Sequence, residues 1–86
     1  MDPAELDAAY EDMKERVGML PAQPPHVMLK LYGLFKQASV GNVQGDRPGM
    51  LDVRGRAKWD AWASRKGVSQ EDAKIEYVNF GEELGA

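Results

Sequence analysis

The sequence contains no cysteine and only one histidine among its 86 residues. The absence of thiols excludes disulfide bonds, thiolate nucleophiles and zinc sites built from cysteine. Small secreted domains are often stapled by disulfides, so this composition favours a cytoplasmic protein. We also expect no metal site, because no group of side chains has the spacing of metal ligands.

Long apolar runs are also absent. No stretch approaches the ~20 consecutive apolar residues that a helix needs to cross a bilayer, so we expect no stable membrane insertion. The first residues show neither the basic start nor the apolar segment of a signal peptide. A chain of this length suits one domain, and we assign residues 1–86 to it.

Signals of catalysis are missing as well. The only histidine, His26, lies in a proline-rich turn without a neighbouring nucleophile, and a general base needs a positioned partner. The sequence has no phosphate-binding loop and no dinucleotide-binding fingerprint. We therefore predict that the protein is not an enzyme and has no cofactor.

The net charge of −3 hides a basic segment. The first 23 residues hold six acidic and two basic side chains, whereas between Arg47 and Lys66 six basic side chains stand against two acidic ones. A mildly acidic protein with one basic segment suits a local anionic ligand. DNA-binding domains are usually basic overall, so we expect no nucleic-acid partner.

Apolar residues recur at helical spacing, and no segment alternates with a period of two, which predicts an all-α protein. Short turns suggest that neighbouring helices are antiparallel. The long loop over residues 41–49 permits an overhand connection between the second and third helices, which could then run parallel. The expected helices are residues 2–18, 25–40, 52–66 and a last one that Ser69 caps.

The second expected helix has two apolar faces on a wheel of about 100° per residue. One is an ordinary core stripe of Val27, Leu31, Leu34 and Ala38. The other gathers Met28, Leu29 and Lys36 around Tyr32, and Phe35 lies between the two faces. Either both faces are buried in a crowded bundle, with Lys36 reaching out to solvent, or the second face is a groove for an amphipathic ligand.

Residues 58–62 form the densest chemical cluster, Lys58-Trp59-Asp60-Ala61-Trp62. The two tryptophans are three residues apart and therefore neighbours on a helix. Either they anchor the core, or Lys58 and Trp59 present a charge beside an aromatic platform for a phosphorylated nucleotide.

Several segments in order resemble the acyl-CoA-binding protein family over nearly the whole chain. They are residues 32–41 (YGLFKQASVG), 47–52 (RPGMLD) and 58–62 (KWDAW), followed by Gly67, Ser69, residues 71–73 and Tyr77. The resemblance implies a four-helix bundle in up-down-down-up order, with a long overhand connection between helices two and three. It also implies a monomer that binds one medium- to long-chain acyl-CoA as an intracellular carrier.

The resemblance also implies roles for single residues. Lys36 and Lys58 would meet phosphates of the coenzyme, and Lys14 would add a basic contact from the first helix. The implied acyl-CoA-binding residues are Lys14, Met28, Leu29, Tyr32, Phe35, Lys36, Lys58 and Tyr77, of which Met28 and Leu29 line the acyl path and Tyr32 and Tyr77 contact the nucleotide and ligand body.

The chain departs from the family pattern at three places. Phe35 stands where the family usually has tyrosine, so a hydroxyl contact to phosphate is lost. Tyr10 occupies a position that is commonly small, beside the expected adenine pocket, where it either stacks on the base or crowds it. The proline-rich turn beside the acyl groove is longer than usual. The alternative to a ligand carrier is a helical protein–protein interaction module.

Overall fold

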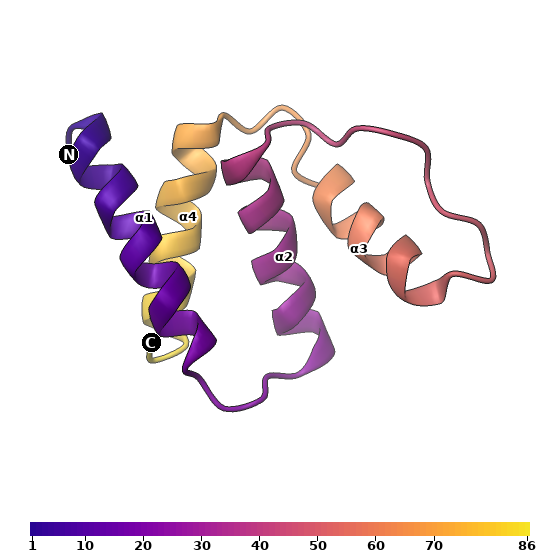
Figure 1. Ribbon diagram of the computed structural model, residues 1–86, viewed down its shortest axis with the longest axis horizontal. Coiled ribbons are helices and arrows are strands. Elements are labelled where there is room, and N and C mark those ends of the chain that lie inside the picture. The colour runs from indigo at the N-terminus through magenta and orange to yellow at the C-terminus, as the bar shows by residue number, and fades with distance from the viewer.

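The computed structural model describes residues 1–86 and contains four α-helices and no strand (Figure 1). The all-α prediction is therefore confirmed. The helices are α1 (Pro3–Gly18), α2 (Pro25–Ser39), α3 (Val53–Ala63) and α4 (Gln70–Glu83).

Three helix starts are fixed by side-chain caps. The Asp2 carboxylate accepts a hydrogen bond from the Glu5 amide at 2.9 Å, and Asp52 accepts one from the Gly55 amide at 3.0 Å. The Ser69 hydroxyl accepts one from the Asp72 amide, also at 3.0 Å. Caps of this kind contribute about 1 kcal/mol each.

Helix α3 ends three residues earlier than the sequence predicts, at Ala63 rather than Lys66. The amides of Arg65 and Lys66 bond to carbonyls three residues back instead of four, which tightens the chain into turns. Gly67 then reverses direction with a φ of +92°. Gly67 therefore ends this turn rather than the helix itself.

The helices follow the up-down-down-up order. Helix α4 packs against both α1 and α2, whereas α3 packs only against α2 among the helices. The connection over residues 40–52 passes back along the molecule, so that α2 and α3 run in the same direction (Figure 1). The resulting bundle is flat, with extents of 40 × 29 × 15 Å.

The core lies where α1, α2 and α4 meet. Its buried members are Tyr10, Met13, Leu31, Leu34, Ala38, Ala73 and Tyr77. Two glycines allow close helix contacts around this core. A side chain at Gly33 would collide with the Ala61 carbonyl on α3, and one at Gly81 would collide with the buried Met13 side chain on α1.

A polar network joins the end of α2 to the two connections that follow it. The buried Gln37 side-chain amide donates to the Asn42 side-chain carbonyl at 3.0 Å and to the Val68 carbonyl at 2.7 Å. The same Asn42 oxygen accepts the Gly67 amide at 2.9 Å. This network holds the start of the long connection against the turn between α3 and α4.

Candidate binding groove

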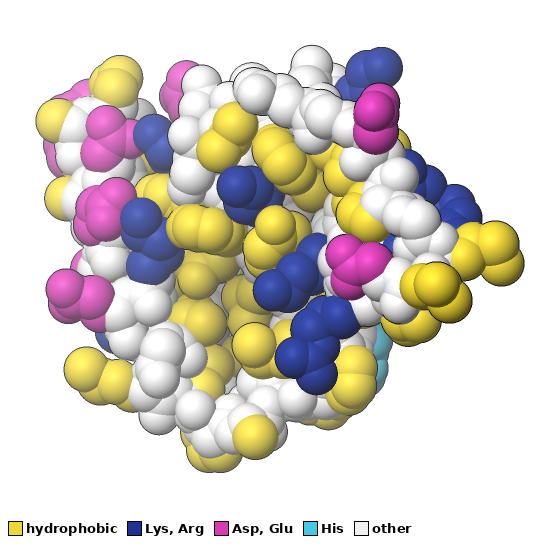
Figure 2. All heavy atoms as spheres, turned by 45° about the vertical axis from the view of Figure 1, so that its right-hand side comes forward, with side chains coloured by type: hydrophobic (Ala, Val, Ile, Leu, Met, Phe, Trp, Pro, Cys, Tyr) yellow, Lys and Arg dark blue, Asp and Glu magenta, His cyan; other side chains and the backbone are white.

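An apolar hollow lies between α1 and α2. Both helices pack against α4 but not closely against each other, which leaves a space of about 210 Å³. Only hydrophobic residues line it: Val17, Met28, Leu31, Tyr32, Phe35 and Tyr77. Figure 2 shows yellow side chains across the middle of this hollowed face.

A second hollow, of about 530 Å³, lies between α2 and the start of α3. Its lining combines apolar side chains with two basic ones: Gln23, Pro25, Met28, Leu29, Val53, Arg54, Ala57 and Lys58. Met28 lines both hollows, so they adjoin. We call the two together the groove.

Two lysines beside the groove have no carboxylate partner. The Lys58 ammonium lies 5.3 Å from the centre of the Tyr32 ring, and the Lys36 ammonium lies 4.7 Å from the Trp62 ring. Both contacts keep the positive charge over an aromatic face without neutralising it. These lysines are therefore available to an anionic ligand.

Arg47 is neutralised instead. Its guanidinium donates two hydrogen bonds to the Asp60 carboxylate, at 2.8 and 2.7 Å. The bound guanidinium holds the pKa of Asp60 below its usual value. This pair fastens the long connection to α3.

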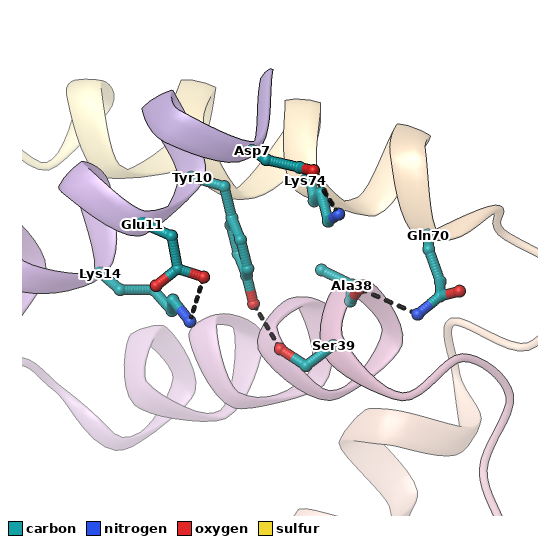
Figure 3. A pocket seen from close by; sticks show the side chains of 8 residues that line it. All are labelled: Asp7, Tyr10, Glu11, Lys14, Ala38, Ser39, Gln70 and Lys74. Carbon is teal, nitrogen blue, oxygen red and sulfur yellow. Dashed lines mark hydrogen bonds and ion pairs between the residues drawn. The ribbon is translucent and has the colours of Figure 1, made fainter. Parts of the chain in front are cut away.

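Lys14 lies on the α1 side, apart from the other two lysines. Its ammonium is 3.0 Å from the Glu11 carboxylate and 4.7 Å from the centre of the Tyr10 ring. It lines a further pocket of about 390 Å³, in which Lys74 is likewise paired with Asp7 (Figure 3). The charges of this pocket are thus largely balanced by its own side chains.

Tyr10 separates that pocket from the apolar hollow. Its hydroxyl donates to the Phe35 carbonyl at 3.3 Å. It also shares a hydrogen bond with the Ser39 hydroxyl at 2.7 Å (Figure 3). Its ring meets the Tyr77 ring edge-on at 5.3 Å and is only 3% exposed. Of the two expectations for Tyr10, this burial favours crowding of the expected adenine pocket over stacking on a base.

Tyr77 is similarly buried and contributes only part of its ring to the hollow. Burial, together with the neighbouring Tyr10, raises the pKa of Tyr77 to about 12. The phenol is therefore neutral at physiological pH and offers a ligand an apolar surface rather than a charge.

The structure brings most of the predicted residues together. Met28, Tyr32, Phe35 and Tyr77 share the apolar hollow, and Leu29 and Lys58 line the second one. Lys36 lies over Trp62, and Lys14 is held in the separate pocket. Sequence analysis did not name seven of the lining residues as binding residues: Val17, Gln23, Pro25, Leu31, Val53, Arg54 and Ala57. Two of them carried a signal, Leu31 as a member of the core stripe of α2 and Arg54 as part of the basic segment between Arg47 and Lys66.

The two tryptophans differ in burial, which bears on whether each anchors the core or presents an aromatic platform. Trp62 is buried, and its indole N–H donates to the Gly41 carbonyl at 2.7 Å, so it anchors the core. Trp59 is half-buried, and its indole N–H has no partner. His26 is exposed, in the first turn of α2.

Two further features of the structure bear on metal binding and on crossing a membrane. No group of three or more His, Asp or Glu side chains is placed to hold a metal ion. None of the helices combines the length and apolar character needed to cross a bilayer.

Comparison with known proteins identifies the family. Residues 4–80 match the acyl CoA binding protein family. The chain is 44% identical over 80 residues to Acyl-CoA-binding protein homolog 1 of Caenorhabditis elegans, covering 92% of this chain and 93% of that protein.

Solved structures agree in fold. The crystal structure of acyl-CoA-binding protein 2 of Oryza sativa superposes with a TM-score of 0.92 at 38% identity, over 94% of this chain and 89% of that one. That of the acyl-CoA-binding protein from Moniliophthora perniciosa gives a TM-score of 0.85 at 40% identity, over 91% and 78%. The chain belongs to the acyl-CoA-binding protein family.

Proposed function

We propose that the protein binds medium- to long-chain acyl-CoA esters non-covalently, as a cytoplasmic, monomeric carrier that holds a pool of these esters. One observation carries this proposal: Lys58 lines the groove, Lys36 lies one helical turn beyond Tyr32 of the groove, and no carboxylate neutralises either charge. An acyl-CoA ester combines the same two characters, an apolar chain and an anionic phosphorylated nucleotide.

The apolar and the basic side chains of the groove would hold the two parts of the ligand. Met28 and Leu29 offer an apolar path for the acyl chain, and Lys36 and Lys58 would form charge-assisted hydrogen bonds to the phosphates. Tyr32, Phe35 and Tyr77 would contact the ligand body, and Lys14 would act once its pair with Glu11 opens. This role needs no catalytic group and no cofactor.

Titration calorimetry with hexadecanoyl-CoA and with free coenzyme A tests the proposal. Each buried CH₂ contributes roughly 0.8 kcal/mol, so about ten would contribute roughly 8 kcal/mol before ordering costs. We expect the ester to bind far more tightly than free coenzyme A. Similar affinities would contradict the two-part groove, and absence of binding to either would favour a protein-interaction module.

A further inference from the structure

The chain carries an apolar tip that no part of the protein covers. Met50, Leu51 and Val53 lie just before and at the start of α3, and their exposed fractions are 80%, 101% and 73%. The tip lies at the edge of the molecule farthest from α1 and α4 (Figure 1). Large apolar side chains clustered in this way mark a contact with something outside the protein.

Unpaired positive charge lies beside this tip. Arg54 and Lys58 line the adjoining hollow together with Val53, and neither has an ion-pair partner. By contrast, the basic residues of α1 and α4 are paired within the molecule: Lys14 with Glu11, Arg16 with Asp12 and Lys74 with Asp7. The one carboxylate at the start of α3, Asp52, is bound to the Gly55 amide as a cap.

Figure 2 shows the same separation across one face. Most magenta acidic side chains of this face lie at its left edge, whereas dark blue basic ones lie mainly across its middle and right, with a few acidic ones among them, and yellow ones project at the right edge. Apolar side chains that project beside basic ones fit the surface of an anionic bilayer, where acyl chains accept the former and headgroups attract the latter.

We propose that the tip formed by Met50, Leu51 and Val53, flanked by Arg54, docks the protein on the surface of an anionic lipid bilayer. Docking is peripheral, with these side chains reaching only the interfacial layer. Because Val53 also lines the hollow with Met28 and Leu29, docking would turn the mouth of the groove toward the lipid. That last consequence rests on the proposed acyl-CoA binding, whereas docking itself does not.

Co-sedimentation with vesicles tests the docking in the absence of any acyl-CoA. We expect the protein to bind vesicles of phosphatidylcholine mixed with phosphatidylserine, and to bind pure phosphatidylcholine vesicles weakly. The double variant Met50→Ser, Leu51→Ser should bind the mixed vesicles about tenfold more weakly or worse, since burying one large apolar side chain is already worth about a factor of ten. Both side chains are exposed, so the fold tolerates the change.

Matched controls distinguish binding through the tip from nonspecific binding through any exposed apolar side chain or any positive charge. Met19 is 83% exposed but lies after α1, so Met19→Ser should bind vesicles as the unaltered protein does. Arg54→Gln should weaken binding to the mixed vesicles, and Arg16→Gln should not. Equal binding by the double variant and the Met19 variant would overturn the proposal.

Two further measurements distinguish lipid docking from dimer formation and from acyl-CoA binding. If sedimentation of the protein alone reveals a dimer that the double variant loses, the tip is an interface between copies and the lipid proposal is wrong. Calorimetry of the double variant with hexadecanoyl-CoA in vesicle-free buffer reports on the groove alone. Loss of vesicle binding with unchanged acyl-CoA affinity supports the docking, and failure of acyl-CoA binding would leave the vesicle result intact.

Discussion

At the scale of single residues, Tyr10 shapes the α1 side of the proposed site. Its ring fills the space between α1 and the last turns of α2, and its hydroxyl bonds to two groups of α2. A small residue there would leave this space open. The proposed site is therefore narrower on the α1 side, and in the proposed complex Lys36 and Lys58 would carry more of the recognition of the nucleotide.

We expect Lys36→Ala and Lys58→Ala each to weaken hexadecanoyl-CoA binding by about tenfold or more, because a hydrogen bond to a charged group contributes about 1.5–3 kcal/mol. The melting temperature should change little, since each ammonium only lies over an aromatic ring. Lys66→Ala is the control, because Lys66 is exposed, follows the end of α3 and neither lines a hollow nor lies over a ring beside one. Unchanged affinity in both groove variants would remove these lysines from the site.

The buried phenol of Tyr77 predicts a loss of stability at high pH. Its pKa is raised from 10.0 to about 12, so the folded state keeps the proton more firmly than the unfolded state does. The corresponding stability is fully present below pH 10 and is lost as the pH rises toward about 12. Urea unfolding across this range should show a smaller decline in Tyr77→Phe; an identical decline in both proteins would contradict the assignment.

Contacts between residues close in the sequence could be predicted, whereas contacts between distant residues could not. The helix start at Asp2 and the cap at Ser69 were predictable because a cap bonds to an amide only three residues away. The partners of Tyr10 lie 25 and 29 residues further along the chain, and no local pattern links such positions. The same holds for the bonds that join Gln37 to Val68 and Asn42 to Gly67.

At the scale of elements, α2 follows its pattern most closely. The predicted core stripe is buried at Leu31, Leu34 and Ala38, and Val27 is half-buried, whereas Met28 on the other face is exposed. Periodicity sufficed because α2 is the element that α3 and α4 flank. Helix α3 was predicted too long because Gly67 was the nearest residue that typically ends a helix. The change to hydrogen bonds between residues three apart, which precedes Gly67, cannot be recognised from the residue types.

Two helical glycines should respond oppositely to alanine. Gly81→Ala gains about 1 kcal/mol of helix propensity but overpacks the buried Met13, at a cost of about 1–3 kcal/mol, so we expect a net loss of stability. Gly18→Ala has no neighbour to displace and should stabilise the fold by about 0.5 kcal/mol. Denaturant unfolding of both variants measures this difference, and a more stable Gly81→Ala protein would show that the α1–α4 contact is loose.

At the scale of the whole molecule, the groove is lined by all four helices, whereas the core joins only α1, α2 and α4. A ligand that fills the groove therefore binds only the folded chain. Hexadecanoyl-CoA at about 100 times its dissociation constant should add about 2.7 kcal/mol of stability. For a domain of this size that raises the melting temperature by about 10–20 °C. Scanning calorimetry should show this shift, with a much smaller one for free coenzyme A at the same concentration.

Among the helices, α3 contacts only α2, and this bears on how the site is assembled. Lys36 lies on α2 and Lys58 on α3, and α3 packs against no other helix. A local opening of α3 would therefore part the two lysines while the core of α1, α2 and α4 stays folded. The measured affinity is then the intrinsic affinity multiplied by the fraction of molecules in which α3 is closed. Substitutions at Gly33, where α3 comes closest to α2, would tune binding without touching the ligand.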